Sequence, residues 1–434
     1  MVHLIFIQIF QKNLRQRHIK MKLKHIFYKN KKYGNKTILY LLRVIPVYTK
    51  KYDGHHAYYS LFGIRILKKQ KVRRIDHTYT DLKLSEQDLN IAITLYGGLG
   101  DMLINANFIY LLRQKIGYVG IRIDVYEPGN LSHALFKEHK FVDNIYPQTN
   151  VEHNRYDLSI DLSRFPILRN VNRRRILFLQ PMLFDFVLMW IKDNTEKYRF
   201  IDDNPKMDGM LNKYLLSRGY KRWNQFDIDH ALGMTEKFPV TLFIDEPEQK
   251  YLKSLKLPKQ FITIHRGVDV KQDVESIKQW PVTYYNKLIQ LIRSKYPNVF
   301  IVQLGDSKDR CPEFDGVNLN LCGETSLEQL KVLLKHAALH IDGEGGMVHV
   351  RHALHGGQSV VLFGPTDPNV YGYSENVNLV GNGCIGGCEW CNENWQSCCA
   401  MGTPHAFCQY SLMPDTVWKS VSGCLEQTLK KGRK

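Results

Sequence analysis

Short apolar runs alternate with segments of helical spacing from residue 89 onward. The run 90–95 is apolar and β-branched, a glycine-rich turn follows it, and the segment 102–115 then places its apolar residues on one helical face. Apolar runs at 121–126 and 158–162 predict two further strands. A strand, a glycine turn and a helix in this order are typical of the start of a doubly wound α/β domain.

The same alternation starts again near residue 260 and predicts a second α/β unit. Its strands are expected at 261–265, 299–305, 339–341 and 359–363, and its helices at 282–295, 326–338 and 346–354. Alternating strands and helices imply parallel sheets. The segment 238–258, rich in proline and acidic residues, is expected to link the units. Ligands of such sheets bind beyond the carboxyl ends of the strands, so two facing units would place the reaction in the cleft between them.

The composition is that of a folded chain. Of the 434 residues 44% are hydrophobic and 24% are charged, which excludes wholesale disorder, collagen and coiled coil. A membrane-spanning helix needs about 18 consecutive apolar residues. The best candidate, residues 37–48, is shorter and contains Arg43.

The net charge of +18 belongs to the N-terminal region. Residues 1–75 hold 19 Lys and Arg and one acid, Asp53, whereas the rest of the chain holds 41 basic and 41 acidic side chains. A neutral body argues against nucleic acid as a partner of the main fold. Apolar clusters between the cations favour an anionic membrane surface. The alternatives are a solvated or subunit-contacting extension and RNA or DNA binding. No secretory signal is expected, and the start at Met1 or Met21 is left open.

Candidate chemistry lies at the predicted strand ends. Asp101 follows the glycine turn 97–100, where the backbone can approach a ligand closely; the alternative is a helix cap. His265 follows the first strand of the second unit. Lys278 precedes a helix that Pro281 opens, where a lysine can reach a phosphate; the alternative is a surface lysine.

Two more clusters follow later strands of the second unit. Acids and glycines come after the strand 339–341, and a histidine follows one turn into the next helix. Backbone N–H groups there suit a pyrophosphate, and carboxylates suit sugar hydroxyls. The turn 364–368 places Thr366 and Asp367 at the rim of the same cleft. A purely structural turn is the alternative for both clusters.

The segment 323–328, the acid-Gly-x-x-x-His run that ends at His349 and the segment 363–368 resemble glycosyltransferase family 9. These are heptosyltransferases that use ADP-heptose, and the resemblance covers about residues 89–375. It implies a GT-B fold of two facing Rossmann-like domains, inverting transfer without a catalytic metal, and Asp101 as the catalytic carboxylate. It also implies a set of donor-binding residues: His265, Lys278, Glu324, Asp342, Glu344, Gly345, Gly346, His349 and Thr366.

One departure concerns the sugar. The family usually has Asp where this chain has Glu344, which leaves heptose against another sugar open. The variant run 344–351 is more similar to the autotransporter heptosyltransferases, which glycosylate secreted bacterial proteins. The resemblance therefore implies an ADP-sugar donor and a protein hydroxyl as acceptor. The alternatives are a lipopolysaccharide or other glycolipid acceptor, and a non-catalytic sugar-nucleotide-binding protein. Inverting transfer needs a base opposite the leaving group, which agrees with a carboxylate such as Asp101.

Six of the nine cysteines fall within 25 residues, from Cys384 to Cys408. A reducing cytosol favours metal over disulfides. The spacing of the first three also fits a radical-SAM motif, which is rejected because that motif opens a barrel domain. The autotransporter branch carries an iron finger in this region, which implies structural iron, or zinc, on four cysteines. The expected ligands are Cys384, Cys388, Cys398 and Cys408. Cys399 is an alternative ligand to Cys398. The alternative to a metal site is that the cysteines are unmetallated or linked by disulfides.

The expected organisation has six parts. They are a basic amphipathic N-terminal region (1–85), an acceptor domain (86–240), a linker (241–258), a donor domain (259–380), a cysteine-rich metal finger (381–412) and a C-terminal helix (413–434). We expect a cytoplasmic enzyme with peripheral contact between residues 1–75 and the inner membrane face, and we leave a homo-oligomer open.

Overall fold

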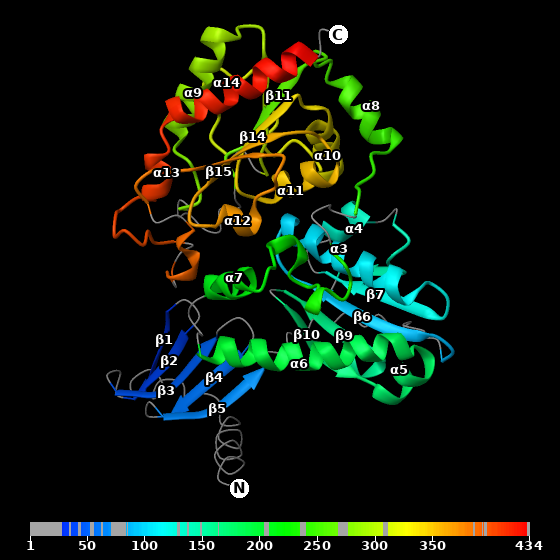
Figure 1. The fold of residues 1–434 in the computed structure, drawn as a ribbon. Helices are drawn as coiled ribbons and strands as arrows, with labels where there is room; N and C mark the ends of the chain where they lie inside the picture. Colours follow the sequence, from blue (N-terminus) through cyan, green and yellow to red (C-terminus); the bar gives the residue numbers. More distant parts are fainter. Residues whose placement is uncertain are drawn as a thin grey trace, which may run out of the picture. The chain divides into compact units, whose positions relative to one another are not determined.

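The computed structural model describes two compact units, Met1–Thr80 and Asp81–Lys434 (Figure 1). In the first unit it describes five strands. From residue 84 to residue 431 it describes the chain except for 85, 128–130, 137–138, 148–149, 164, 204–207, 235–239, 268–276, 307–310, 385–386, 393 and 395–396.

The first unit contains an antiparallel sheet in the order β1-β2-β3-β4-β5. Its strands are β1 (Tyr28–Tyr33), β2 (Lys36–Leu41), β3 (Ile45–Tyr52), β4 (His56–Leu61) and β5 (Ile64–Gln70). The expected basic extension thus includes a sheet that the sequence pattern did not predict. The side chains on which the membrane-surface expectation depends lie outside the described part of the structure.

The second unit begins with the N-terminal lobe (residues 84–234), built on a five-stranded sheet in the order β10-β9-β6-β7-β8. Its strands are β6 (Leu89–Leu95), β7 (Ile121–Tyr126), β8 (Asn144–Tyr146), β9 (Leu158–Leu162) and β10 (Pro166–Val171). All pairs are parallel except β9 with β10. The expected strands at 90–95, 121–126 and 158–162 are confirmed.

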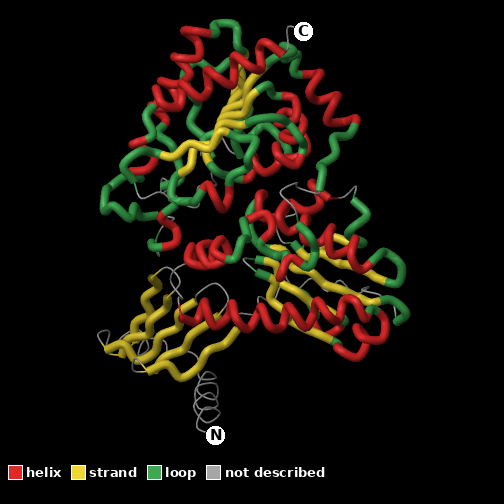
Figure 2. The backbone as a smooth tube through the Cα atoms, in the orientation of Figure 1, coloured by secondary structure: helices red, strands yellow, loops and turns green. Residues whose placement is uncertain are grey.

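The C-terminal lobe (residues 240–431) contains a six-stranded, wholly parallel sheet in the order β13-β12-β11-β14-β15-β16. Its strands are β11 (Phe261–Ile264), β12 (Phe300–Gln303), β13 (Leu319–Asn320), β14 (Leu339–Gly343), β15 (Ser359–Phe363) and β16 (Val377–Val380). This is the order of a doubly wound fold, in which the winding reverses between β11 and β14 and opens a crevice at their carboxyl ends. Figure 2 shows the sheets of the N-terminal and C-terminal lobes as separate layers of strands among helices.

Burial on both faces explains why several strands are uninterrupted apolar runs. Every residue of β6, β9, β11 and β15 is buried, as is typical of parallel sheets covered by helices. The N-terminal lobe contributes α3 (Leu99–Ile116), α4 (Leu131–Phe136), α5 (Arg173–Leu179), α6 (Pro181–Asp203) and α7 (Asp208–Ser217). The C-terminal lobe contributes α8 (Glu246–Ser254), α9 (Val282–Lys295), α10 (Leu327–His336), α11 (Gly346–Ala353), α12 (Pro368–Tyr371), α13 (Phe407–Ser411) and α14 (Pro414–Lys431).

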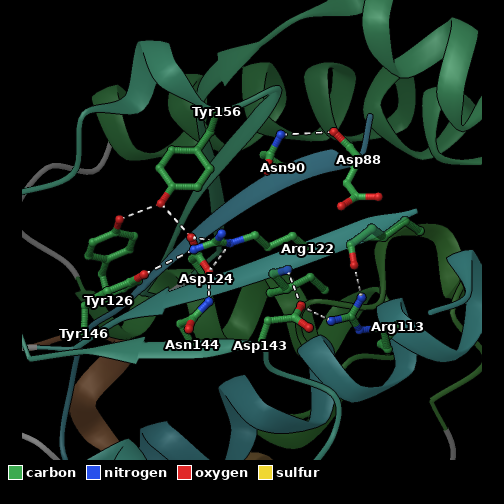
Figure 3. A network of polar contacts seen from close by, with 12 residues as sticks. Asp88, Asn90, Arg113, Arg122, Asp124, Tyr126, Asp143, Asn144, Tyr146 and Tyr156 are labelled. Carbon is green, nitrogen blue, oxygen red and sulfur yellow. Dashed lines mark hydrogen bonds and ion pairs between the residues drawn. The ribbon is translucent and has the colours of Figure 1, made fainter. Parts of the chain in front are cut away.

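Alternate residues of β7 divide between the apolar core and a polar network (Figure 3). Ile123 belongs to the core, whereas the neighbouring Asp124 is fully buried among polar groups. Its carboxylate accepts hydrogen bonds from Arg122 at 3.0 Å, Asn144 at 2.7 Å and the Tyr156 hydroxyl at 2.9 Å. A buried charge is costly unless it is paired and hydrogen-bonded, and these donors meet that condition. The network holds β7 to β8 and to the loop before β9.

The expected linker contains a helix, α8, that is attached to the C-terminal lobe. Asp245 caps it and forms a reciprocal capping box with Glu248, a pattern that fixes a helix start. The buried Glu248 carboxylate pairs with Lys331 of α10 at 2.8 Å. The linker is therefore ordered against the lobe that follows it. None of the described helices is long and apolar enough to cross a bilayer.

Candidate functional site

A cavity of about 510 Å³ lies between the two lobes, at the carboxyl ends of both sheets. This volume is within the range of ligand pockets. In the N-terminal lobe the winding reverses between β6 and β9, and the cavity is lined by Tyr96 and Ser163, which follow these strands. In the C-terminal lobe it reverses between β11 and β14, and the lining includes His265 and Glu344. Both crevices predicted by sheet topology therefore open into one cavity.

Asp101 lies in the first turn of α3 and lines the cavity. One carboxylate oxygen accepts the Gly98 N–H at 2.8 Å, and the other is paired with the guanidinium of Arg222. Burial alone would raise the pKa of Asp101, but Arg222 and the Gly98 N–H outweigh burial and hold the pKa below its usual range. Asp101 is therefore a carboxylate at neutral pH, and it both caps the start of α3 and lines the cavity.

Arg222 is a cavity residue that sequence reasoning missed. It comes from the 3-10 turn η3 (Arg222–Asn224), 121 positions from Asp101 in the chain, and its side chain is largely buried. No periodicity or motif marks it. Tyr96, Ser163 and Asp306 were missed as well, although each follows a strand closely, so a strand-end rule applied to every strand would have found them.

Lys278 and Glu344 meet on the opposite wall of the cavity. The ammonium group of Lys278 donates to the Glu344 carboxylate at 2.6 Å, and the Thr366 hydroxyl donates to the same oxygen at 3.0 Å. Burial would raise the pKa of Glu344, but the charge of Lys278 outweighs it and the pKa lies below its ordinary value. An ammonium group and an ionised carboxylate are thus paired on the cavity wall, and groups of these two kinds can also bind phosphates and hydroxyls.

His265 lines the cavity and is held from behind by Asp342. Its Nδ1 lies 2.8 Å from one oxygen of Asp342, whose other oxygen is 3.1 Å from Nε2 of the buried His340. Burial lowers the pKa of His265, but the Asp342 carboxylate outweighs burial and raises the pKa above its ordinary value. The result is a cavity-lining histidine that protonates more readily than usual and can therefore help to stabilise an anion.

His349 lies one turn into α11 and is neutral. Burial lowers its pKa to about 4. Its Nδ1 is 2.5 Å from the Tyr373 hydroxyl, and its ring packs so closely against Gly100 of α3 that a Cβ there would lie 2.4 Å from the ring carbon Cδ2. A Cβ on Gly346 would likewise lie 2.8 Å from Cβ of Leu99. A side chain at either position would force its neighbours to move, because the first turns of α3 and α11 touch across the cleft.

The structure brings most of the predicted residues to the cavity wall. Those that line it are Asp101, His265, Lys278, Glu344, Gly345, Gly346 and His349. Thr366 lies behind Glu344, and Asp342 is fully buried behind His265, so both support lining residues. Glu324 is exposed and is not part of the lining. Asp367 caps α12 and pairs with Lys213 of α7 in the other lobe.

The cysteine-rich segment places Cys384, Cys388, Cys391, Cys399 and Cys408 close enough to influence one another's ionisation. The pKa of Cys408 is raised to about 12, first by burial and then by Cys384, Cys388 and Cys399. Cys398 is exposed, whereas the Cys399 sulfur accepts the Phe407 N–H at 3.5 Å. Of the two adjacent thiols, the expected ligand Cys398 is exposed, and its alternative Cys399 lies closer to the other cysteines. In the described residues no three His, Cys, Asp or Glu side chains are already arranged around a metal position. Thiolates are nevertheless the donor type that iron and zinc sites of proteins use.

Comparison with known proteins identifies the C-terminal half. Residues 227–399 match the sequence model of glycosyltransferase family 9 (heptosyltransferase). No curated protein matches the chain.

Several solved structures share the fold. A family 9 glycosyl transferase from Veillonella parvula DSM 2008 is 15% identical, covering 80% of this chain and 100% of its own, with a TM-score of 0.51. The iron-containing dodecameric glycosyltransferase TibC from enterotoxigenic E. coli H10407 is 14% identical, covering 88% of this chain and 84% of its own, with a TM-score of 0.51. The structure of TibC in complex with ADP-D-β-D-heptose is 12% identical, covering 87% of this chain and 84% of its own, with a TM-score of 0.52.

Two α/β lobes with parallel sheets, a cavity at both switch points and the family match lead to one assignment. The resemblance seen in the sequence is confirmed: residues 227–399 match the glycosyltransferase family 9 (heptosyltransferase) model, and this match indicates a glycosyltransferase.

Proposed function

We propose that this enzyme transfers heptose from ADP-heptose to a hydroxyl of a protein acceptor, with inversion at the sugar carbon. The observation that carries the proposal is that Asp101 of one lobe and the pair Lys278–Glu344 of the other line the same cavity. Fold likeness alone would not support a substrate, so the proposal depends on the chemistry of these side chains and on the family resemblance.

The C-terminal wall suits the diphosphate of the donor. Lys278, the readily protonated His265 and the N-terminal turn of α11 converge there. Helix N-termini and cations stabilise the charge that accumulates as a nucleoside diphosphate leaves. Glu344 and the neutral His349 supply acceptors and donors for sugar hydroxyls. One solved neighbour, TibC, contains ADP-D-β-D-heptose, which supports this choice of donor.

Asp101 is the proposed general base. It would take the proton of the acceptor hydroxyl while the hydroxyl oxygen bonds to the anomeric carbon. The bond from that carbon to the diphosphate oxygen breaks on the opposite face, and ADP leaves with the electron pair. Arg222 must release Asp101, at least in part, for the carboxylate to accept the proton, because an ion-paired carboxylate is a weaker base.

Structural iron or zinc is proposed for the thiols of Cys384, Cys388, Cys399 and Cys408. When bound, such a metal would cross-link a segment that has little apolar core of its own. The TibC structures are described as iron-containing, which supports the proposal. The transfer itself would be carried out by the cavity residues alone.

A glycolipid acceptor is the second candidate. The +18 charge of residues 1–75 favours it, because a basic region would bring the enzyme to the anionic inner face of a membrane and to acceptors held there. The same location, cytoplasmic and peripheral, would also serve a protein acceptor before its export.

The test measures ADP release and product mass with the purified full chain, ADP-heptose and either a protein or a glycolipid acceptor. We expect transfer to protein, loss of transfer in Asp101→Asn, and ADP affinity within about twofold of wild type in that variant, since the base does not contact the nucleotide. Full turnover by Asp101→Asn would remove Asp101 from the mechanism. Transfer to glycolipid alone would overturn the protein acceptor, and no turnover with any acceptor would favour a non-catalytic binding protein.

A further inference from the structure

The cysteine-rich segment (residues 381–412) contacts Lys278, on the C-terminal wall of the cavity, through the side chain of Gln409. This side chain is completely buried, and its Nε2 donates a hydrogen bond of 2.8 Å to the main-chain carbonyl of Lys278. Gln409 directly follows Cys408, one of the four thiols proposed above as metal ligands. A residue of the segment thus holds the backbone of the lysine that we assign to the donor phosphates.

The neighbours of Lys278 are held by the same segment. Ile277 packs in a small apolar cluster with Ala406 and Cys408, against which Cys384 lies. On the other side, the indole N–H of Trp280 donates to the Leu412 carbonyl at 2.8 Å. Within the described part of the chain, the turn 277–280 therefore has contacts with residues 384–412 before, at and after Lys278.

The amide of Gln409 is fixed by close packing as well as by its hydrogen bond. A Cβ on Gly364 would lie 2.4 Å from the Gln409 Nε2 and 3.4 Å from the Ile277 carbonyl. Gly364 follows β15 and does not have a positive φ, so its glycine is explained by this close approach. The turn 364–368, expected to carry ligand contacts, thus also forms one side of the pocket that holds Gln409.

Backbone position matters for Lys278 because its ammonium group must reach across to Glu344, 2.6 Å away, and exchange that partner for a phosphate. A long side chain reaches a fixed point only when its Cα is fixed, and a small displacement at a positioning contact weakens binding. The hydrogen bond from Gln409 is a direct polar contact between the main chain of Lys278 and the cysteine-rich segment.

We propose that Gln409 is a positioning residue for Lys278 and that it connects the cysteine-rich segment to the affinity of the cleft for the nucleotide diphosphate. This inference rests on the proposed function, since it takes Lys278 as the phosphate contact. Gln409 contacts neither donor nor acceptor and acts only through the lysine.

A double-mutant cycle tests the inference by measuring the ADP dissociation constant calorimetrically for wild type, Gln409→Met, Lys278→Ala and the double variant. Methionine keeps the volume of glutamine and removes the donor. We expect Gln409→Met to weaken ADP binding on the order of tenfold, the upper range for one hydrogen bond. In the Lys278→Ala background the same change should have no further effect, because coupled residues are not additive. The donor KM should rise with the acceptor KM unchanged.

Two further variants keep the result interpretable. Gly364→Ala displaces the Gln409 amide without altering it and should reproduce the loss of ADP affinity even if Gln409→Met folds poorly. Gln358→Met removes an amide whose Nε2 bonds the Glu375 carbonyl elsewhere in the lobe and should leave ADP affinity unchanged. Unchanged ADP affinity in Gln409→Met, or an equal additional loss in both backgrounds, would overturn the positioning role. Unchanged ADP affinity in Lys278→Ala would instead overturn the proposed function of Lys278.

Discussion

At the scale of single residues, the cavity is organised by ion pairs that link distant parts of the chain. Arg222 pairs with Asp101, and Lys278 pairs with Glu344. Each pair holds a carboxylate in its charged form, although burial would favour the neutral one. In each pair, the opposite charge of the partner compensates for the cost of burying the ion. Removing one partner leaves the other charge buried without compensation. In the proposed mechanism they therefore determine the protonation states on which transfer depends.

Arg222→Gln should shift the acid limb of the kcat/KM profile to higher pH. As the proposed general base, Asp101 must be a carboxylate; its folded pKa is lowered mainly by Arg222 against burial, so activity should be lost as pH falls through that pKa. Without Arg222, burial raises the pKa, so activity is lost at a higher pH. The other groups that face Asp101 are the Gly98 N–H and His349, which is neutral above about pH 4 and adds no competing titration near neutrality.

Arg155→Gln is the matched control for this profile. Arg155 pairs with Glu152 on the exposed surface of the same lobe, at 3.1 Å. Exposed pairs contribute little, so its profile should overlay that of wild type. An unshifted acid limb in Arg222→Gln would show that Arg222 does not control the base.

At the scale of elements, the sequence predicted the scaffold because periodicity and turn chemistry are local. The strands β6 and β15 and the helices α3 and α9 follow directly from apolar spacing. The cavity-lining residues of the C-terminal lobe were predicted from the rule that ligands bind at strand ends. Arg222 and Gln409 could not be predicted, because each acts on a residue more than a hundred positions away and neither has a local signature. The choice of Cys399 over its neighbour Cys398 likewise depends on which thiol turns toward Cys408.

The adjacent pair Cys398 and Cys399 allows a direct test of the metal proposal. Elemental analysis of the purified full chain should find about one equivalent of iron or zinc, as a four-thiolate site requires. Cys399→Ser should lose most of that metal and unfold at a lower temperature, whereas Cys398→Ser, at an exposed position, should keep both. Less than a tenth of an equivalent in the wild type would exclude the metal. Equal loss in both variants would contradict the assignment of the four thiols.

At the scale of the whole molecule, the two lobes of the second unit meet at the first turns of α3 and α11. Gly100 of α3 packs on the His349 ring of α11, and Asp101 directly follows Gly100 in the sequence. The distance between the proposed base on one lobe and the proposed donor-binding wall on the other is thus set by a contact that leaves no room for a methyl group. Closure of two lobes around a ligand is how such enzymes exclude water and align reactants.

Gly100→Ala should therefore impair transfer more than it impairs folding. The added Cβ would lie 2.4 Å from the His349 ring, so the ring or the helix must move, and overpacking of this kind costs about 1–3 kcal/mol. We expect kcat/KM to fall at least about tenfold, because a shift of α3 moves Asp101 away from the donor wall. Gly423→Ala in α14 is the control: a Cβ there meets nothing within 4 Å, and replacing a helical glycine should stabilise the fold by about 0.5–1 kcal/mol. Wild-type turnover in Gly100→Ala, measured beside an unimpaired Gly423→Ala, would show that the lobes do not need this contact to bring base and donor together.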